Sequence, residues 1–161
     1  MKLYHGSLEI VQKPEIRKAT RTLDYGSGFY TTTSYVQAEA WVRRRMDEAK
    51  QNRGYVNVYE MSEAVTADIK QLIFQAPTEE WVDFVMRNRT EKDFVHDYDI
   101  VYGPVANDRV YAAFALYEGG LLNKQDLIKE LRAYKLVDQY LFHTDAALKN
   151  LSFVEAKEVT L

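Results

Sequence analysis

Cysteine is absent from this chain of 161 residues, and proline and glycine are sparse, with three and seven residues. Without cysteine the chain has no disulfides, no thiolate chemistry and no cysteine-ligated zinc. A chain of this kind suits a reducing compartment, and the N-terminal segment M-K-L-Y-H-G lacks the apolar core of a signal peptide. We therefore expect a cytoplasmic protein.

Long hydrophobic runs and a strong charge of one sign are also missing. No run approaches the length that spans a bilayer, so we expect no membrane partner. The formal net charge is −3, which provides no global field for nucleic acid or anionic lipid. Hydrophobic residues at 47% and charged residues at 28% are typical of a globular chain, and the length fits one domain over residues 1–161.

Hydrophobic patterning and turn residues predict alternating strands and helices. Helices are expected after Ser34, after Pro77-Thr78, from Asn107 or Asp108 to about Tyr117, and from Asn123, with a short helix or turn at 146–151. Strands are expected at 2–6, 29–33, 55–61, 65–74, 98–103, 137–143 and 152–159.

Two helices carry specific packing predictions. The helix after Ser34 is expected to end near Gly54 and to bury a stripe made of Val36, Ala40, Trp41 and Met46. In the next helix Trp81, Phe84 and Val85 share one face and are most simply core residues. Because the spacing between strands is irregular, we predict an α+β fold rather than a doubly wound sheet.

Three short strings each indicate a strand edge that presents one polar or aromatic side chain. They are L-Y-H-G-S at 3–7, D-Y-G-S-G-F-Y-T-T-T at 24–33 and D-Q-Y-L-F-H-T at 138–144. The presented side chains are His5, Tyr30 and Gln139. The Gly26-Ser27-Gly28 segment is neither a Rossmann fingerprint nor a P-loop, because the third glycine and the Gly-Lys-Ser/Thr ending are missing. By itself it is typical of a hairpin corner.

Taken together, the strings resemble the His–Tyr–acid triad of the ADP-ribosyltransferases, in the branch of the poly(ADP-ribose) polymerases and diphtheria toxin. The whole layout resembles a bacterial family placed among the ADP-ribosyltransferases. The likeness runs through residues 3–7, 26–32, 81–85, 99–108 and 139–144. It implies an ADP-ribosyltransferase-like fold of two packed, mostly antiparallel sheets, a split β core flanked by helices.

The resemblance also implies an NAD-dependent mono-ADP-ribosyltransferase that releases nicotinamide. His5 would bond a ribose hydroxyl, the backbone of Gly6 would pair with the nicotinamide carboxamide, and Tyr30 would stack on the nicotinamide ring. By the same resemblance the NAD-binding set is His5, Gly6, Ser7, Gly28, Tyr30 and Thr31.

Gln139 stands where well-studied relatives carry Glu. Its amide oxygen can still accept a bond from the ribose 2′-OH and stabilise an oxocarbenium-like transition state. An amide is no base near neutral pH, and loss of a general base typically costs about 10²–10⁴-fold in rate. Because side chains alternate across a strand, Asp138 is predicted to point away from the Gln139 face. Two alternatives stay open: a catalytically silent module that binds NAD or another nucleotide or serves interactions, and an NAD glycohydrolase.

The acceptor is open as well: a protein, a nucleic acid or a small molecule. By analogy, compact bacterial members act as toxins neutralised by an antitoxin protein, or as effectors. We expect no metal, because His5, His96 and His143 are far apart in sequence. Residues 43–45 are three consecutive arginines, read either as a solvated surface or as a phosphate contact. Two roles are open for these aspartates. Asp99 and Asp108 could both line the acceptor side, or Asp108 could instead cap the next helix.

Overall fold

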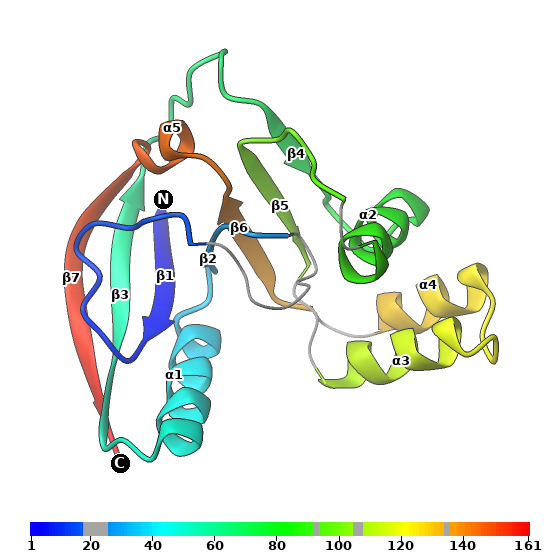
Figure 1. The fold of residues 1–161 in the computed structure, drawn as a ribbon, viewed down its shortest axis with the longest axis horizontal. Helices are drawn as coiled ribbons and strands as arrows, with labels where there is room; N and C mark the ends of the chain where they lie inside the picture. The colour runs from blue at the N-terminus through cyan, green and yellow to red at the C-terminus, as the bar shows by residue number, and fades with distance from the viewer. Residues whose placement is uncertain (18–25, 92–93, 105–107, 134–135) are drawn as a thin grey trace.

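The strands form two sheets in the computed structural model, which describes residues 1–17, 26–91, 94–104, 108–133 and 136–161 (Figure 1). The first sheet has the order β1-β3-β7 and is antiparallel throughout. The second has the order β2-β6-β5-β4 and is antiparallel except for the β4–β5 pair. The strands are β1 (Lys2–Ser7), β2 (Phe29–Thr31), β3 (Arg53–Met61), β4 (Gln71–Ile73), β5 (Ile100–Pro104), β6 (Asp138–Phe142) and β7 (Leu151–Thr160). The molecule is therefore α+β with two mostly antiparallel sheets.

One isolated bridge joins the two sheets. The backbone N–H of Tyr4 donates to Thr32 at 2.8 Å, and the N–H of Thr32 donates to Tyr4 at 2.9 Å. A core between the sheets includes Leu3 and Tyr59 from the first sheet and Phe29, Ile100 and Phe142 from the second. This core also receives the short helix α5 (Asp145–Leu148) through Ala147.

Helix α1 (Tyr35–Ala49) packs on the first sheet. Ser34 caps it as predicted, because its hydroxyl accepts a bond from the N–H of Gln37 at 3.2 Å. Of the predicted stripe only Met46 is buried, and the predicted stop at Gly54 is wrong. Val36 is 78% exposed and Trp41 is 40% exposed, whereas the buried residues are Ala38, Val42 and Met46. The helix ends at Lys50, in the left-handed conformation with φ 53°, while Gly54 lies inside β3.

Both corrections have the same cause, which is the close approach of α1 to the sheet. Gly54 faces Val42 and Met46, and Gly6 on the neighbouring strand faces Ala38 and Val42. A side chain at either glycine would clash with α1. The two glycines therefore allow α1 to pack closely on the sheet, and Gly54 does not end the helix. The helix accordingly turns its Ala38–Val42 line toward the sheet.

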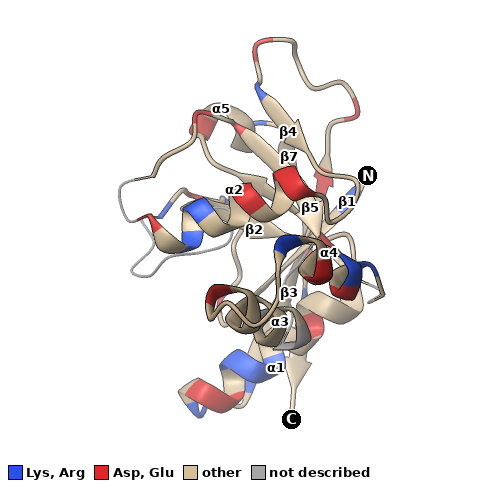
Figure 2. Cartoon of the chain, turned by 90° about the vertical axis from the view of Figure 1, so that its right-hand side faces the viewer, with Lys and Arg blue, Asp and Glu red and all other residues tan. Residues whose placement is uncertain are grey.

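Helices α2 (Glu79–Thr90), α3 (Asp108–Glu118) and α4 (Lys124–Ala133) lie on one face of the second sheet (Figure 1). Their core contains Trp81, Phe114, Leu127, Leu131 and Leu141. Thr78 and Asn123 accept backbone bonds from Trp81 and Asp126, at 3.3 and 2.8 Å. Charged residues of both signs lie along α1, α2 and α4, and in α2 the acidic residues precede the basic ones (Figure 2).

Two further predictions are corrected. The strand expected at 65–74 is only Gln71–Ile73, because the chain turns at Thr66–Ile69 before entering the sheet. Phe84 is partly rather than fully buried. Asn107 and the side chain of Asp108 lie outside the described residues. Over the described ranges, none of the helices combines the length and apolar character needed to cross a membrane.

Candidate functional site

Among the described residues, the outer edge of β1 makes no backbone hydrogen bond beyond its bridge to Thr32. In an antiparallel pair, successive residues direct their N–H and C=O groups to opposite sides of the strand. Tyr4 directs both groups toward Thr32, so Gly6 also directs both groups away from β3. No partner for the Gly6 backbone on that side occurs among the described residues. A donor and an acceptor therefore stand side by side at a half-buried position.

Gly6 has a structural reason to be glycine. A Cβ atom there would lie 2.6 Å from the carbonyl oxygen of Ala38 and 3.3 Å from Cδ1 of Trp41. Any side chain would push α1 off the sheet. The open backbone groups and the helix contact thus belong to one residue.

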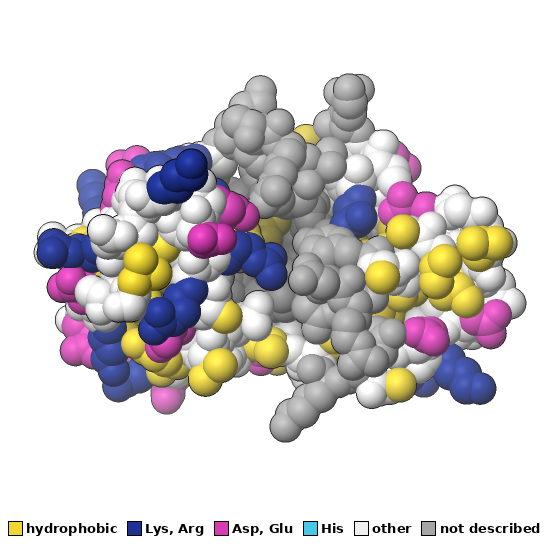
Figure 3. Space-filling view, turned by 90° about the horizontal axis from the view of Figure 1, so that it is seen from below, with side chains coloured by type: hydrophobic (Ala, Val, Ile, Leu, Met, Phe, Trp, Pro, Cys, Tyr) yellow, Lys and Arg dark blue, Asp and Glu magenta, His cyan; other side chains and the backbone are white. Residues whose placement is uncertain are grey.

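Tyr30 and Gln139 share the sheet face on which Gly6 lies. Tyr30 pairs with Leu141 on β6, and Gln139 lies two residues from Leu141 on the same side of that strand. Gly6 and Tyr30 each lie two residues from the Tyr4–Thr32 bridge, and no backbone hydrogen bond joins the two residues. We call Tyr4, Gly6, Tyr30, Thr32 and Gln139 the strand junction. Seen from below, hydrophobic side chains lie among charged side chains of both signs on the described surface (Figure 3).

Gln139 is the buried polar residue of the strand junction. It is 7% exposed and pairs with Gly103 of β5. Among the described residues, no hydrogen-bond partner occurs for its carboxamide, and the amide atoms are not sealed from solvent. Because its amide atoms still reach solvent, the carboxamide can offer a donor and an acceptor to a ligand.

Tyr30 is held from two sides. Its hydroxyl donates to the carbonyl oxygen of Gly26 at 2.6 Å. Its ring packs against the core under α2, α3 and α4. The ring is thereby fixed across the junction from Gly6, on the side of the second sheet.

His5 lies on the reverse face of β1. Its Nδ1–H donates to the carbonyl oxygen of Tyr30 at 2.7 Å, and its ring lies 4.3 Å from that of Phe29. Burial lowers the pKa of His5, and the nearby Arg17 cation lowers it further. Burial therefore favours the neutral imidazole, in which the Nδ1–H bond to Tyr30 leaves Nε2 as an acceptor. The structure brings His5 to the backbone of Tyr30 but not to its ring.

The Asp138 carboxylate forms hydrogen bonds on the sheet face opposite Gln139, as the alternation along β6 predicts. One carboxylate oxygen accepts from the N–H and hydroxyl of Thr33, and the other accepts from the Tyr102 hydroxyl at 2.7 Å. Burial and the bond to Asp138 raise the pKa of Tyr102. The carboxylate ties the end of β2 to β5 on the face opposite Gln139.

The other predicted NAD-binding residues make local contacts. The hydroxyl of Ser7 accepts from the N–H of Glu9 at 3.2 Å, and that of Thr31 donates to Tyr140 at 2.8 Å. A Cβ at Gly28 would lie 2.8 Å from the carbonyl oxygen of Phe142 and from Nδ1 of His143. Glycine there lets the turn before Tyr30 pack on the end of β6. Their roles toward NAD stay predictions.

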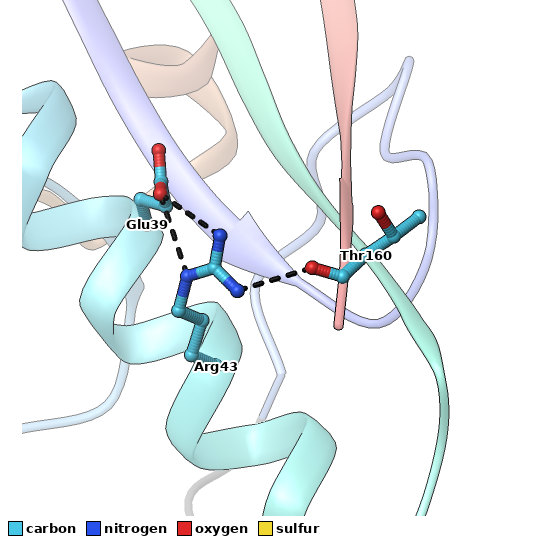
Figure 4. A network of polar contacts seen from close by, with 3 residues as sticks. All are labelled: Glu39, Arg43 and Thr160. Carbon is cyan, nitrogen blue, oxygen red and sulfur yellow. Dashed lines mark hydrogen bonds and ion pairs between the residues drawn. The ribbon is translucent and has the colours of Figure 1, made fainter.

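The remaining candidates are mostly structural. Asp99 accepts from Lys70 N–H at 2.8 Å and from Thr144 hydroxyl at 2.7 Å, so it clips a turn to the end of β6. Arg43 bonds Glu39 and the carbonyl oxygen of Thr160 (Figure 4), and Arg45 bonds Glu48.

No group of three potential metal ligands occurs within the described ranges. The expectation of metal-free chemistry stays a prediction.

A hollow of about 320 Å³ lies at the ends of β4 and β5 and the start of β6, beside α4. It is lined by Tyr102, Gly103, Arg132 and Asp138, among others. Gly6 and Gln139 do not line it. We place the candidate site at the strand junction rather than here, because the polar groups lacking partners stand at the junction.

The sequence pattern predicted Trp41 in the buried stripe of α1, whereas its side chain is 40% exposed. The signal that could have found it is the Ala38–Val42–Met46 line, which competes with Val36–Ala40 as the buried stripe. Choosing the first line puts the indole on the flank of the helix.

A family model with the description "Protein of unknown function (DUF3990)" matches residues 1–153. No curated protein matches the chain. No solved structure matches it.

Proposed function

We propose that this chain, which belongs to the family described as protein of unknown function (DUF3990), is an NAD-dependent mono-ADP-ribosyltransferase. The observation that carries the proposal is that two polar groups at the strand junction have no hydrogen-bond partner among the described residues. The backbone of Gly6 offers an N–H and a C=O, and Gln139 offers a buried carboxamide. The resemblance to ADP-ribosyltransferases assigns both residues to NAD, and the broad α+β arrangement of two mostly antiparallel sheets is compatible with that fold.

Gly6 suits the nicotinamide carboxamide. That group carries one acceptor oxygen and an N–H₂ donor, which complement the N–H and C=O of a single strand residue. Peptide strands recognise one another by the same pairing. The β1 edge would therefore hold the leaving group in a fixed orientation.

Gln139 is suited to the nicotinamide ribose. Its carboxamide oxygen can accept a bond from the 2′-OH and stabilise the positive charge that develops at C1′. The C1′–N bond breaks with its electron pair going to nicotinamide, and the acceptor's nucleophilic atom then bonds C1′ and loses its proton. Gln139 cannot take that proton, and Asp138 is held by Thr33 and Tyr102 on the other face. The proton goes to the acceptor's own base or to solvent.

His5 is suited to a second hydroxyl contact. The Nδ1–H bond to Tyr30 leaves Nε2 as an acceptor, and a neutral ring is the form that burial favours. His5 would therefore accept from a ribose hydroxyl at the edge of β1 rather than act as a cationic acid.

The test compares purified wild type with Gln139→Ala and Gln139→Glu after incubation with NAD. Nicotinamide is measured with and without cell extract, and labelled NAD identifies the modified acceptor after protease or nuclease treatment. We expect release that depends on extract, strongly reduced in Gln139→Ala and retained or raised in Gln139→Glu.

Two results would replace the proposal. Release without extract would indicate an NAD glycohydrolase. Thermal stabilisation by NAD with no release under either condition would indicate a silent NAD-binding module, which the amide at position 139 favours. We propose a toxin or effector role, an antitoxin partner and a cytoplasmic location together with the transferase activity. These three proposals depend on that activity.

A further inference from the structure

The hollow of about 320 Å³ beside α4 presents two side chains of opposite charge. Asp138 lines it as a half-buried residue of β6, and Arg132 lines it as an exposed residue in the last turn of α4. Among the described residues, neither side chain forms an ion pair. An anion and a cation therefore face one hollow, and no described residue supplies a counter-charge to either.

The Asp138 carboxylate can bind a cation in addition to its present contacts. It accepts from the N–H and hydroxyl of Thr33, and from the Tyr102 hydroxyl at 2.7 Å. These donors are all neutral, and an ionised carboxylate offers about four lone-pair sites. Opposite charges attract more strongly where water is partly excluded, so an ammonium group entering the hollow would gain a charge-assisted bond.

Much of the remaining wall is apolar. Phe74 and Pro77 line the hollow from the segment at the end of β4, Leu131 lines it from α4, and Leu136 lines it just before β6. The volume lies at the lower end of the range of about 300–1,000 Å³ that is typical of small-molecule sites. The wall therefore suits a small molecule with an ammonium group, a carboxylate and an aliphatic body.

We propose that this hollow binds a free α-amino acid with an aliphatic side chain. The ammonium group pairs with Asp138, the carboxylate pairs with Arg132, and the side chain lies along the apolar wall. The inference goes beyond the proposed function and does not require NAD. Because Gly103 lines the hollow and pairs with Gln139, the amino acid would lie at the end of the strands that carry the candidate site.

The experiment titrates isotope-labelled protein with four compounds and follows the backbone amides by NMR. The compounds are leucine, glycine, isoamylamine and isocaproate. Glycine lacks the aliphatic body, isoamylamine lacks the carboxylate, and isocaproate lacks the ammonium group. We expect leucine to shift the amide signals of Gly103, Leu136 and Val137, which line the hollow.

The four affinities should differ in a fixed order. Isocaproate and glycine should bind at least about tenfold more weakly than leucine, because each loses a buried contact. Isoamylamine should bind only about 2- to 5-fold more weakly, because the pair that it loses involves the exposed Arg132.

Three variants assign the two charges. Asp138→Asn, measured well below its unfolding midpoint, should weaken leucine by at least about tenfold, and Arg132→Gln should weaken it by about 2- to 5-fold. Isoamylamine should not respond to Arg132→Gln, because it has no carboxylate. The matched control Lys129→Gln removes another exposed cation from α4, one that does not line the hollow, and should leave every affinity unchanged.

Three results would overturn the inference. The first is that leucine leaves the signals of Gly103, Leu136 and Val137 unshifted in wild type. The second is that leucine, isoamylamine and isocaproate bind with equal affinity. The third is that leucine keeps its full affinity in both Asp138→Asn and Arg132→Gln. The amide spectrum of each variant shows whether its fold is intact, and nicotinamide release plays no part in these outcomes.

Discussion

Asp138 and Gln139 are consecutive residues of β6 with opposite relations to the rest of the protein. The Asp138 carboxylate is bonded to Thr33 and Tyr102, whereas the Gln139 carboxamide has no partner among the described residues. One side chain connects strands, and the other is available to a ligand. Substitutions at the two positions should separate stability from binding.

For Gln139→Met we expect an unfolding free energy within about 1 kcal/mol of wild type, because the carboxamide has no hydrogen-bond partner among the described residues and methionine has a similar volume. NAD-dependent nicotinamide release should be lost. Urea denaturation and a nicotinamide assay check the two halves. A large loss of stability would mean that the amide has a structural partner.

For Asp138→Asn we expect the converse. The bonds from Thr33 and Tyr102 lose their ionised acceptor, so unfolding free energy should fall by roughly 1.5–3 kcal/mol. NAD affinity measured well below the new unfolding midpoint should change little. Tyr102→Phe is the matched control, and coupling with Asp138→Asn in a double-mutant cycle would show that the two share one interaction.

Gly6→Ala tests the contact between β1 and α1. The new methyl group would overlap the carbonyl oxygen of Ala38 and the side chain of Val42. We expect a loss of roughly 1–3 kcal/mol in denaturant unfolding, typical of overpacking. Gly119→Ala, where the nearest atom would be 3.3 Å away, should cost no more than about 0.5 kcal/mol. Equal effects at the two glycines would contradict the packing argument.

His143 predicts an acid-sensitive fold. Burial lowers the pKa of His143 to about 4 from its ordinary 6.5, despite the bond from Nδ1–H to Ser27 at 2.7 Å. The folded state therefore prefers the neutral ring, and unfolding takes up a proton below pH 6.5. Stability from this group is complete above pH 6.5 and falls between pH 6.5 and 4, by about 3 kcal/mol in total.

His143→Gln should flatten that part of the pH–stability profile. Burial lowers the pKa of His5 in the same direction, so a smaller slope should remain. Chemical unfolding at half-unit pH steps measures both profiles. An unchanged slope in His143→Gln would show that His143 takes up no proton on unfolding.

Local sequence signals predicted the elements well where one signal dominates. Ser34 and Thr78 are helix caps, and the strand pattern around residues 55–61 places β3 within two residues. The period of two along β6 also predicted that Asp138 would oppose Gln139. These features depend on neighbouring residues alone, so one sequence is sufficient to find them.

The misplaced features depend on contacts between distant segments. Val36–Ala40 and Ala38–Val42 are equally good helical spacings, and only the glycines of β1 and β3 decide between them. The openness of Gly6 depends on which neighbour Tyr4 bonds, which no local pattern encodes. The same holds for the ring of His5, which the bond to Tyr30 fixes on the reverse face of β1.

Within the part of the chain that the structure describes, the long strand β7 is an edge strand of the first sheet. Such a border is a template for another chain, yet Glu155, Lys157 and Glu158 project from it into water. A strand of a second molecule that paired with β7 would have to desolvate these charged side chains. The charged side chains of β7, the strand that also contacts α1, thus disfavour pairing of this edge with another chain.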